Sequence, residues 1–191
     1  HSLGAQSVLA TEYVEDVMRD WRSLGVGGHF TGRHPWLTYH ERLAPALATL
    51  VGAEPTEVIA MNTLTANLHL MLVSFYRPSG LRRAILMERS AFPSDRHAVE
   101  SQVRFHGLDP ARDLIEIAPR DGEDLLRTED IVATVEREGA RIATILLPGV
   151  QYLTGQLLDV EAITAAGRKA GCVVGWDLAH AVGNVPVSLH D

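Results

Sequence analysis

The apolar run at 172–174, which leads directly into Gly175-Trp176-Asp177-Leu178-Ala179-His180, constrains the fold more than any other segment. Such a run predicts a buried strand, and Asp177 then stands at its carboxyl end. In open α/β sheets, ligands bind outside the carboxyl ends of the strands. The segment therefore predicts an α/β protein with an acidic side chain at its ligand-binding edge.

Other apolar runs alternate with helix-like segments along the chain. We expect strands at 84–87, 142–147 and 172–176. We expect helices at 5–24, 38–51, 128–138 and 159–170, a further helix that includes Leu68, and another that ends at about residue 104. This alternation is typical of a mostly parallel sheet covered by helices on both faces. The loops at 88–95, 148–155 and 177–184 are then predicted to share one edge of that sheet.

Hydroxyl residues and glycines predict several helix ends. Thr38 and Glu41 have the spacing of a capping box, and Thr128 is predicted to cap the helix that follows it. Gly52 and Gly139 are predicted stops.

Composition narrows the classes of function. The 191 residues suffice for one domain with a sizeable core, and the net charge of −7 argues against a nucleic-acid partner. No apolar run is long enough to cross a bilayer, and the first residues show no secretory signal pattern, so we expect no membrane association. The lone Cys172 fits a reducing cytoplasm. The histidines follow no metal-ligand spacing, so we expect no metal site.

Asp177 suggests a particular cofactor. A charged carboxylate after a buried strand is costly unless it has a partner. In enzymes that use pyridoxal phosphate, an Asp in this position pairs with the protonated pyridine nitrogen. The alternative is an Asp that caps the next turn, with His180 an ordinary hydrogen-bonded histidine. The single lysine, Lys169, is expected at the C-terminal end of a helix, on the amino side of the last strand. This position is opposite the expected site, so Lys169 is a poor candidate for the cofactor's Schiff base.

Two further segments fit such a cofactor. Asn62-Thr63-Leu64-Thr65 precedes a helix, and helix N-termini bind phosphates well. Phe92-Pro93-Ser94-Asp95 offers an aromatic ring to stack on a flat ligand and an acid to reach a ring nitrogen. The alternatives are a plain helix cap for the first segment and a plain turn for the second.

Five segments in the same order resemble the kynureninase family, which consists of pyridoxal phosphate enzymes with the aspartate aminotransferase fold (fold type I). The similar segments are residues 29–36, 61–70, 91–95, 149–156 and 171–191. The resemblance implies a large α/β domain with a mostly parallel sheet. It also implies that residues 1–30 border the active site, that 31–191 form part of the large domain, and that the small C-terminal domain lies outside this sequence.

The resemblance also implies roles for individual residues. Leu64 and Thr65 would hold the cofactor phosphate, and Phe92 would stack on the pyridine ring. His180 would lie beside Asp177, the main partner of the ring nitrogen. The implied cofactor-binding residues are Leu64, Thr65, Phe92, Ser94, Asp95, Asp177 and His180, and the implied substrate-binding residues are His29 and Ser2. The Schiff-base lysine is expected after Asp191, so this segment contains no catalytic residue of its own.

The implied reaction is the hydrolysis of L-kynurenine, or its 3-hydroxy form, to anthranilate or 3-hydroxyanthranilate and L-alanine, in tryptophan degradation and NAD biosynthesis. The family implies a homodimer. Two positions depart from its pattern: His1 stands where an Asn is expected, and Pro148 stands where family members can carry a hydroxyl.

Two other functions are compatible with the sequence. A cysteine desulfurase or selenocysteine lyase shares the Asp-x-x-His pattern after the same strand, but needs a catalytic cysteine further along the chain. A binding module or inactive homologue would lack the lysine altogether.

Overall fold

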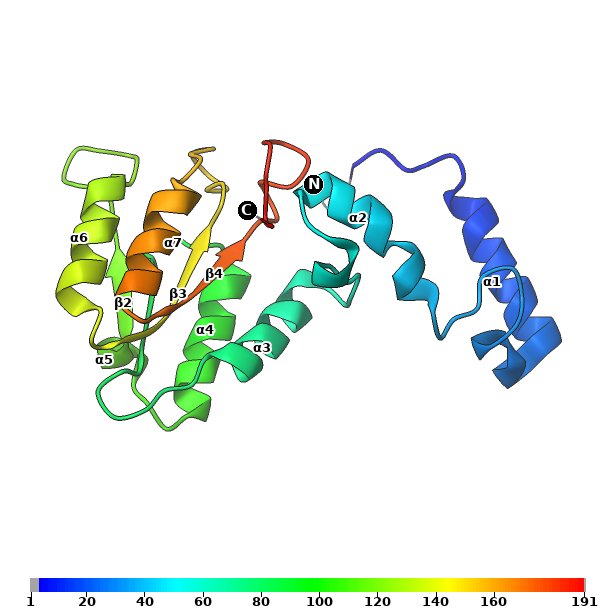
Figure 1. Cartoon of the computed structure of the whole chain (residues 1–191), viewed down its shortest axis with the longest axis horizontal. Coiled ribbons are helices and arrows are strands. Elements are labelled where there is room, and N and C mark those ends of the chain that lie inside the picture. The colour runs from blue at the N-terminus through cyan, green and yellow to red at the C-terminus, as the bar shows by residue number, and fades with distance from the viewer. Residues whose placement is uncertain (1–3, 191) are drawn as a thin grey trace. The chain divides into compact units, whose positions relative to one another are not determined.

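The computed structural model describes residues 4–190, which form two compact units (Figure 1). The first comprises the residues up to Met61 together with those from Pro186 onward, and the second comprises Asn62–Val185. The predicted division into residues 1–30, bordering the active site, and residues 31–191 stays a prediction.

The second unit is built on a four-stranded parallel sheet with the strand order β2-β1-β3-β4. The strands are β1 (Ala84–Glu88), β2 (Leu114–Ile117), β3 (Ile142–Pro148) and β4 (Val173–Asp177). The three predicted strands are confirmed to within one residue at each end. No strand was predicted at β2, which is one of the two edge strands. The prediction that the last strand is buried is wrong, because β4 is the other edge strand and Val173 is 40% exposed.

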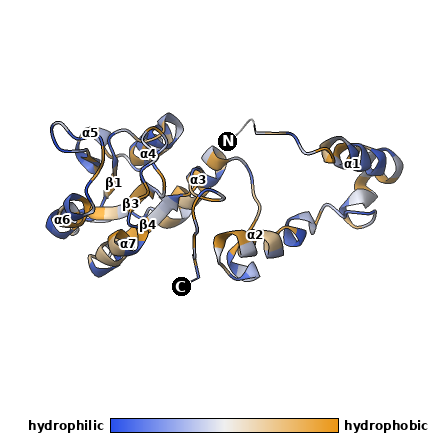
Figure 2. Ribbon diagram, turned by 90° about the horizontal axis from the view of Figure 1, so that it is seen from above, coloured by the Kyte–Doolittle hydropathy of each residue, from blue (hydrophilic) through white to orange (hydrophobic). Residues whose placement is uncertain are grey.

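Helices cover both faces of this sheet, which confirms the predicted α/β class (Figure 2). One face is covered by α3 and α4, and the other by α6 and α7. The helices are α3 (Leu64–Phe75), α4 (Pro93–Phe105), the short α5 (Pro110–Asp113), α6 (Thr128–Glu138) and α7 (Val160–Lys169).

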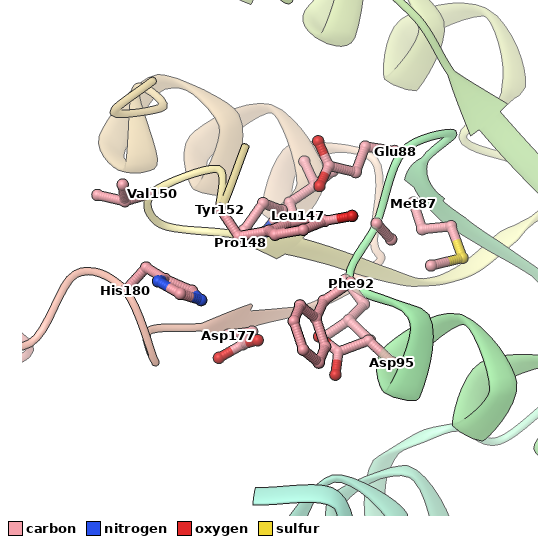
Figure 3. A pocket seen from close by; sticks show the side chains of 12 residues that line it. Met87, Glu88, Phe92, Asp95, Leu147, Pro148, Val150, Tyr152, Asp177 and His180 are labelled. Atoms are coloured by element: carbon pink, nitrogen blue, oxygen red, sulfur yellow. The ribbon is translucent and has the colours of Figure 1, made fainter. Parts of the chain in front are cut away.

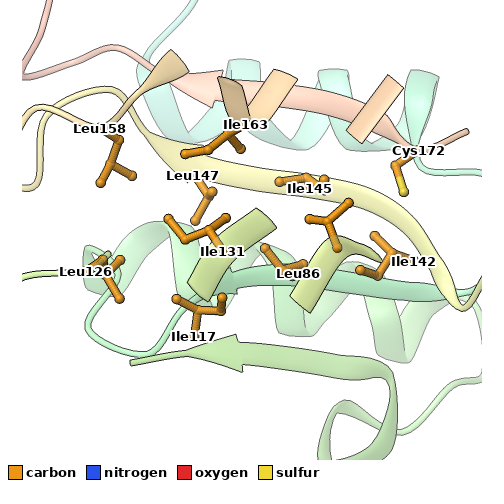
Figure 4. Close-up of a cluster of buried hydrophobic side chains, with 11 residues drawn as sticks. Leu86, Ile117, Leu126, Ile131, Ile142, Ile145, Leu147, Leu158, Ile163 and Cys172 are labelled. Carbon is orange, nitrogen blue, oxygen red and sulfur yellow. The ribbon is translucent and has the colours of Figure 1, made fainter. Parts of the chain in front are cut away.

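Alternate residues of the central strands supply the two halves of the core, because neighbouring side chains of a strand point to opposite faces. Leu86 packs with Ile131 of α6 and Ile163 of α7 (Figure 4). Its neighbours Ile85 and Met87 pack in the cluster on the α3 and α4 side. Both clusters are buried, so the position of the sheet is fixed from both sides.

Arg82 ties the amino edge of the sheet together. Its Nη1 donates to the carbonyls of Gly139 at 2.9 Å and Ile142 at 2.8 Å, and its Nη2 donates to the carbonyl of Ala170 at 3.0 Å. One guanidinium thus joins the end of α6, the start of β3 and the end of α7.

The first unit is helical. It contains α1 (Ala10–Leu24), α2 (Ala44–Val51) and the 3₁₀ turns η1 (Gly25–His29), η2 (Tyr39–Arg42) and η3 (Pro55–Glu57). The predicted helix at 5–24 begins only at Ala10. Gly52 ends α2 as predicted, with a left-handed φ of 61°.

The predicted helix at 38–51 is broken, and its predicted capping box is wrong. Thr38 makes no side-chain cap, and the segment divides into η2 and α2. Pro45 explains the break, because a proline ring is excluded from a helix interior but accepted in a first turn, where Pro45 now lies. A capping box forms instead at η3, between Glu54 and Glu57.

The predicted cap of α6 is also wrong. Thr128 is the first helical residue, and Arg127 precedes it in extended backbone without a side-chain cap. The Arg127 carbonyl itself accepts the N–H groups of Asp130 and Ile131, which satisfies two donors of the first turn. Gly139 is confirmed as the end of the helix.

No helix within residues 4–190 is both long and apolar enough to cross a membrane.

Candidate active site

A small pocket lies at the carboxyl edge of the sheet, where β1, β3 and β4 end (Figure 3). All three predicted loops reach it, as expected for parallel strands. Its polar and aromatic lining residues are Glu88, Phe92, Asp95, Tyr152, Asp177 and His180. Pro148, one of the two departures from the family pattern, also lines it.

Two acids meet at the pocket. Asp95 lies in the first turn of α4 with only 6% of its surface exposed, and Asp177 is the last residue of β4. Burial, and next a side-chain hydrogen bond with Asp177, raise the pKa of Asp95 to about 7. Because a carboxylate cannot donate a hydrogen bond, this bond requires the proton that Asp95 keeps up to about pH 7.

Further hydrogen bonds orient the two acids. The Ala179 N–H donates to Asp177 Oδ1 at 2.8 Å, so Asp177 also caps the turn that leads to His180. The Ser94 hydroxyl donates to Asp95 Oδ1 at 3.3 Å, so Ser94 touches the pair without lining the pocket. Asp177 therefore does cap the following turn, which was the alternative to a cofactor role, and it also lines the pocket.

Aromatic rings form one wall. Phe92, at the start of α4, keeps 43% of its surface exposed, and its ring meets Tyr152 edge-on with centroids 5.1 Å apart. The Tyr152 ring lies 6.4 Å from that of His180, at an interplanar angle of 38°. The three rings therefore follow one another from α4 across to the loop after β4. An exposed ring beside an acid pair suits a flat, positively charged heterocycle.

Gly149 allows the loops after β3 and β4 to approach each other closely. Its N–H donates to the Asp177 carbonyl at 2.8 Å. A Cβ at this position would lie 2.6 Å from Leu178 Cδ2 and 3.2 Å from the Ala181 Cβ. The turn carrying His180 thus packs directly on the backbone of residue 149.

Glu88 and Gln151 also belong to the site, although neither was predicted from the sequence. Glu88 ends β1 at the pocket, and Gln151, which is 5% exposed, hydrogen-bonds to it. Burial raises the pKa of the Glu88 carboxyl. The signal that identified Asp177, an acid directly after an apolar run, applies equally to Glu88. No local signal distinguishes Gln151.

The predicted phosphate-binding residues lie at the start of a helix. Leu64 and Thr65 begin α3 in the same unit but do not line the pocket, and Thr63 caps that helix by accepting the Ala66 N–H at 3.4 Å. His29 belongs to the first unit. Its ring stands edge-on to Trp36, with centroids 5.3 Å apart. Ser2 lies outside the described residues.

Lys169 is the last residue of α7, the helix that leads back to the start of β4, so it lies at the amino edge. This confirms that it is badly placed for a Schiff base at the pocket. No cluster of potential metal ligands occurs among residues 4–190.

The whole chain is similar in sequence to curated kynureninases. All 191 residues align at 56% identity with those of Koribacter versatilis and Myxococcus xanthus, and at 53% with that of Nematostella vectensis. The aligned region is 45%, 45% and 41% of those proteins, so the chain spans somewhat less than half the length of the curated relatives it matches. No family model matches the chain.

The fold resembles that of solved enzymes at much lower sequence identity. The cystine C–S lyase C-DES matches 97% of this chain with a TM-score of 0.74 at 16% identity, over 48% of its own length. DndA from Streptomyces lividans matches 96% of this chain with a TM-score of 0.63 at 21% identity, over 51% of its own length. A variant of C-DES carries glycine covalently linked to its pyridoxal phosphate cofactor. These likenesses place the chain in the fold type I class.

Proposed function

We propose, on the premise that this chain is a segment of a kynureninase, that the full-length protein uses pyridoxal phosphate to hydrolyse L-kynurenine or 3-hydroxykynurenine. The products are anthranilate or 3-hydroxyanthranilate, and L-alanine. The observation that carries the proposal is the buried Asp95 next to the half-buried Asp177, beside the exposed ring of Phe92. Alignment of all 191 residues with kynureninases supports the choice of substrate.

The residues at the pocket fit this cofactor. Asp95 and Asp177 place two carboxyls at the pocket, and these offer acceptors for a cationic N–H donor, which a protonated pyridine nitrogen provides. When bound, pyridoxal phosphate supplies an electron sink for the carbanion formed at the substrate. Asp177, held by the Ala179 N–H, keeps the ring nitrogen protonated, while Ser94 orients Asp95.

Other residues receive the rest of the cofactor and the substrate. Phe92 stacks on the pyridine ring, and His180 lies beside the cofactor near Asp177. The N–H groups of Leu64 and Thr65 at the start of α3 hold the phosphate, since the first N–H groups of a helix have no partner within it. His29 and Ser2 would bind the substrate, as the resemblance to the kynureninase family implies.

The Schiff base requires a lysine from outside this segment. Lys169 is the single lysine among the 191 residues, and it lies at the amino edge of the sheet. The lysine of the complete protein would form the Schiff base and move the α-proton.

We further propose that the enzyme is a homodimer of the cytoplasm. α3 leaves Leu70, Val73 and Phe75 exposed, and such apolar surface favours a partner surface. The single cysteine, buried Cys172, is compatible with a reducing compartment. Sedimentation equilibrium of the full-length protein tests the dimer, and a mass of one chain would contradict it.

The test of the activity mixes the full-length protein with pyridoxal phosphate and L-kynurenine and follows anthranilate fluorescence. Rapid release supports the proposal. A cofactor absorbance band without anthranilate, combined with sulfur release from cysteine, would favour a desulfurase of the same fold. Failure to form the band would contradict the cofactor assignment itself.

A further inference from the structure

Gln151 uses its buried side chain to join two loops at the pocket. Its Nε2 donates to the Ser90 carbonyl at 3.1 Å and to Glu88 Oε1 at 3.4 Å. Its Oε1 accepts the N–H groups of Leu153 at 2.6 Å and Thr154 at 2.9 Å. The amide group therefore donates on one side and accepts on the other.

Only an amide satisfies this arrangement. The two backbone N–H groups require an acceptor, while the Glu88 carboxyl and the Ser90 carbonyl require a donor. A carboxylate at position 151 would face two oxygens. An apolar side chain would leave all five partners without this bond, since the Thr154 hydroxyl also donates to Oε1 at 3.4 Å. Buried polar groups lose about 1–3 kcal/mol each when left unpaired.

The joined segments carry the aromatic wall. Tyr152 stands between Gln151 and Leu153, and Ser90 lies two residues before Phe92. The same amide therefore holds the backbone on both sides of the edge-on contact between Tyr152 and Phe92.

We propose that Gln151 is a positioning residue. It holds Tyr152 and Phe92 in the edge-on arrangement that lets Phe92 stack on the cofactor ring, and its buried hydrogen bond to Glu88 anchors it. The inference rests on the proposed function and deepens it. Gln151 does not itself line the pocket, so it acts through the two aromatic side chains.

The same loop contains a matched control. Gln156 also makes a pair of amide hydrogen bonds: its Nε2 donates to the Leu126 carbonyl at 2.6 Å, and its Oε1 accepts the Leu126 N–H at 2.9 Å. These bonds anchor the loop to the segment before α6. Neither Gln156 nor Leu126 lines the pocket.

The experiment compares Gln151→Met and Gln156→Met in the full-length protein. Without cofactor, amide hydrogen exchange at Leu153 and Thr154 is expected to rise about tenfold in Gln151→Met alone, because these N–H groups lose their acceptor. With pyridoxal phosphate, Gln151→Met is expected to weaken cofactor binding about tenfold and to reduce the visible circular dichroism of the cofactor band. Gln156→Met is expected to leave both cofactor readouts unchanged.

A charge exchange gives a rescue test. Gln151→Glu alone places a carboxylate against Glu88 and is expected to behave like Gln151→Met or worse. Adding Glu88→Gln supplies a donor to the new carboxylate, so the double variant is expected to recover part of the dichroism.

Two outcomes would overturn the inference. One is unchanged dichroism and amide exchange in Gln151→Met, and the other is an equal loss of dichroism in Gln156→Met. A wild-type protein that forms no cofactor band would contradict the proposed function and the stacking role of Phe92. Amide exchange would then still decide whether Gln151 holds the loop.

Discussion

Asp95 of α4 and Asp177 of β4 share a side-chain hydrogen bond at the carboxyl edge of the sheet, although they are far apart in the chain. Burial and this bond raise the pKa of Asp95 from an ordinary 3.8 to about 7. Between pH 3.8 and about pH 7 the folded protein therefore holds a proton that the unfolded chain has already released.

This raised pKa predicts how stability depends on pH without cofactor. Because the folded-state pKa lies above the unfolded value, the contribution of Asp95 is fully present below pH 3.8 and is lost as pH rises toward about 7. The full-length apoprotein should thus lose this part of its stability between about pH 4 and about pH 7. Urea midpoints across this range measure the effect.

Asp95→Asn removes the titrating group and should flatten that part of the pH profile. Asp121→Asn, at an exposed position, is the control and should retain the wild-type slope. An unchanged slope in Asp95→Asn would contradict the assignment of the retained proton to this pair.

Phe92→Leu should weaken binding of pyridoxal phosphate about tenfold, because an aromatic stack contributes about 0.5–1.5 kcal/mol beyond its buried area. Fluorescence titration of the full-length apoprotein measures the affinity. Phe105→Leu makes the same change at the exposed end of α4 and should bind normally. Equal affinities of the Phe92 variant and the wild type would exclude Phe92 from the cofactor site.

Gly149→Ala should strain the turn that carries His180, because the new Cβ would displace Leu178 Cδ2, 2.6 Å away at the end of a flexible side chain, and would also crowd the Ala181 Cβ at 3.2 Å. We expect a loss of about 1–3 kcal/mol in the free energy of unfolding, together with weaker cofactor binding. Gly175→Ala provides the comparison, since its Cβ would meet Leu146 Cδ1 at an ordinary 3.7 Å. Similar effects of both variants in urea unfolding and cofactor titration would contradict the close approach at Gly149.

Much of this fold could be predicted from the sequence. Apolar runs predicted three strands. The central strands β1 and β3 are buried on both faces and need apolar side chains throughout, whereas β4 is partly exposed at an edge of the sheet. β2 was not predicted from the sequence, because it has only four residues, includes the charged Glu116 and lies at a sheet edge. Helix caps were predicted less well than helices, as Thr38 and Thr128 show, because backbone carbonyls and Pro45 determine those starts.

The site was predictable where one residue carries its own signal. Asp177 and Phe92 lie at or after the carboxyl ends of apolar strands, and ligands of parallel α/β sheets bind at this edge. The bond between Asp95 and Asp177, and the Gln151 amide that joins two loops, depend on contacts between distant segments. No local pattern specifies such contacts, so only the folded chain reveals them.

Arg82→Met should destabilise the fold by about 3 kcal/mol, because three backbone carbonyls lose a charged donor at once. Arg137→Met removes an exposed arginine that pairs with Glu138, and should change the free energy of unfolding by less than about 1 kcal/mol. Guanidinium unfolding of both full-length variants measures the difference. Equal stabilities would contradict the role assigned to Arg82 at the amino edge.

The proposed role of Asp177, support of kynurenine hydrolysis through the cofactor ring, is tested most directly by anthranilate release from full-length Asp177→Asn. Asparagine can still accept the Ala179 N–H but carries no charge, whereas Asp159→Asn changes an exposed helix cap of the same kind and serves as the control. We predict that kcat/KM falls at least about a hundredfold for Asp177→Asn, as for other losses of charge stabilisation at an active site, and stays near wild type for Asp159→Asn. Wild-type rates of anthranilate release from Asp177→Asn would contradict the account.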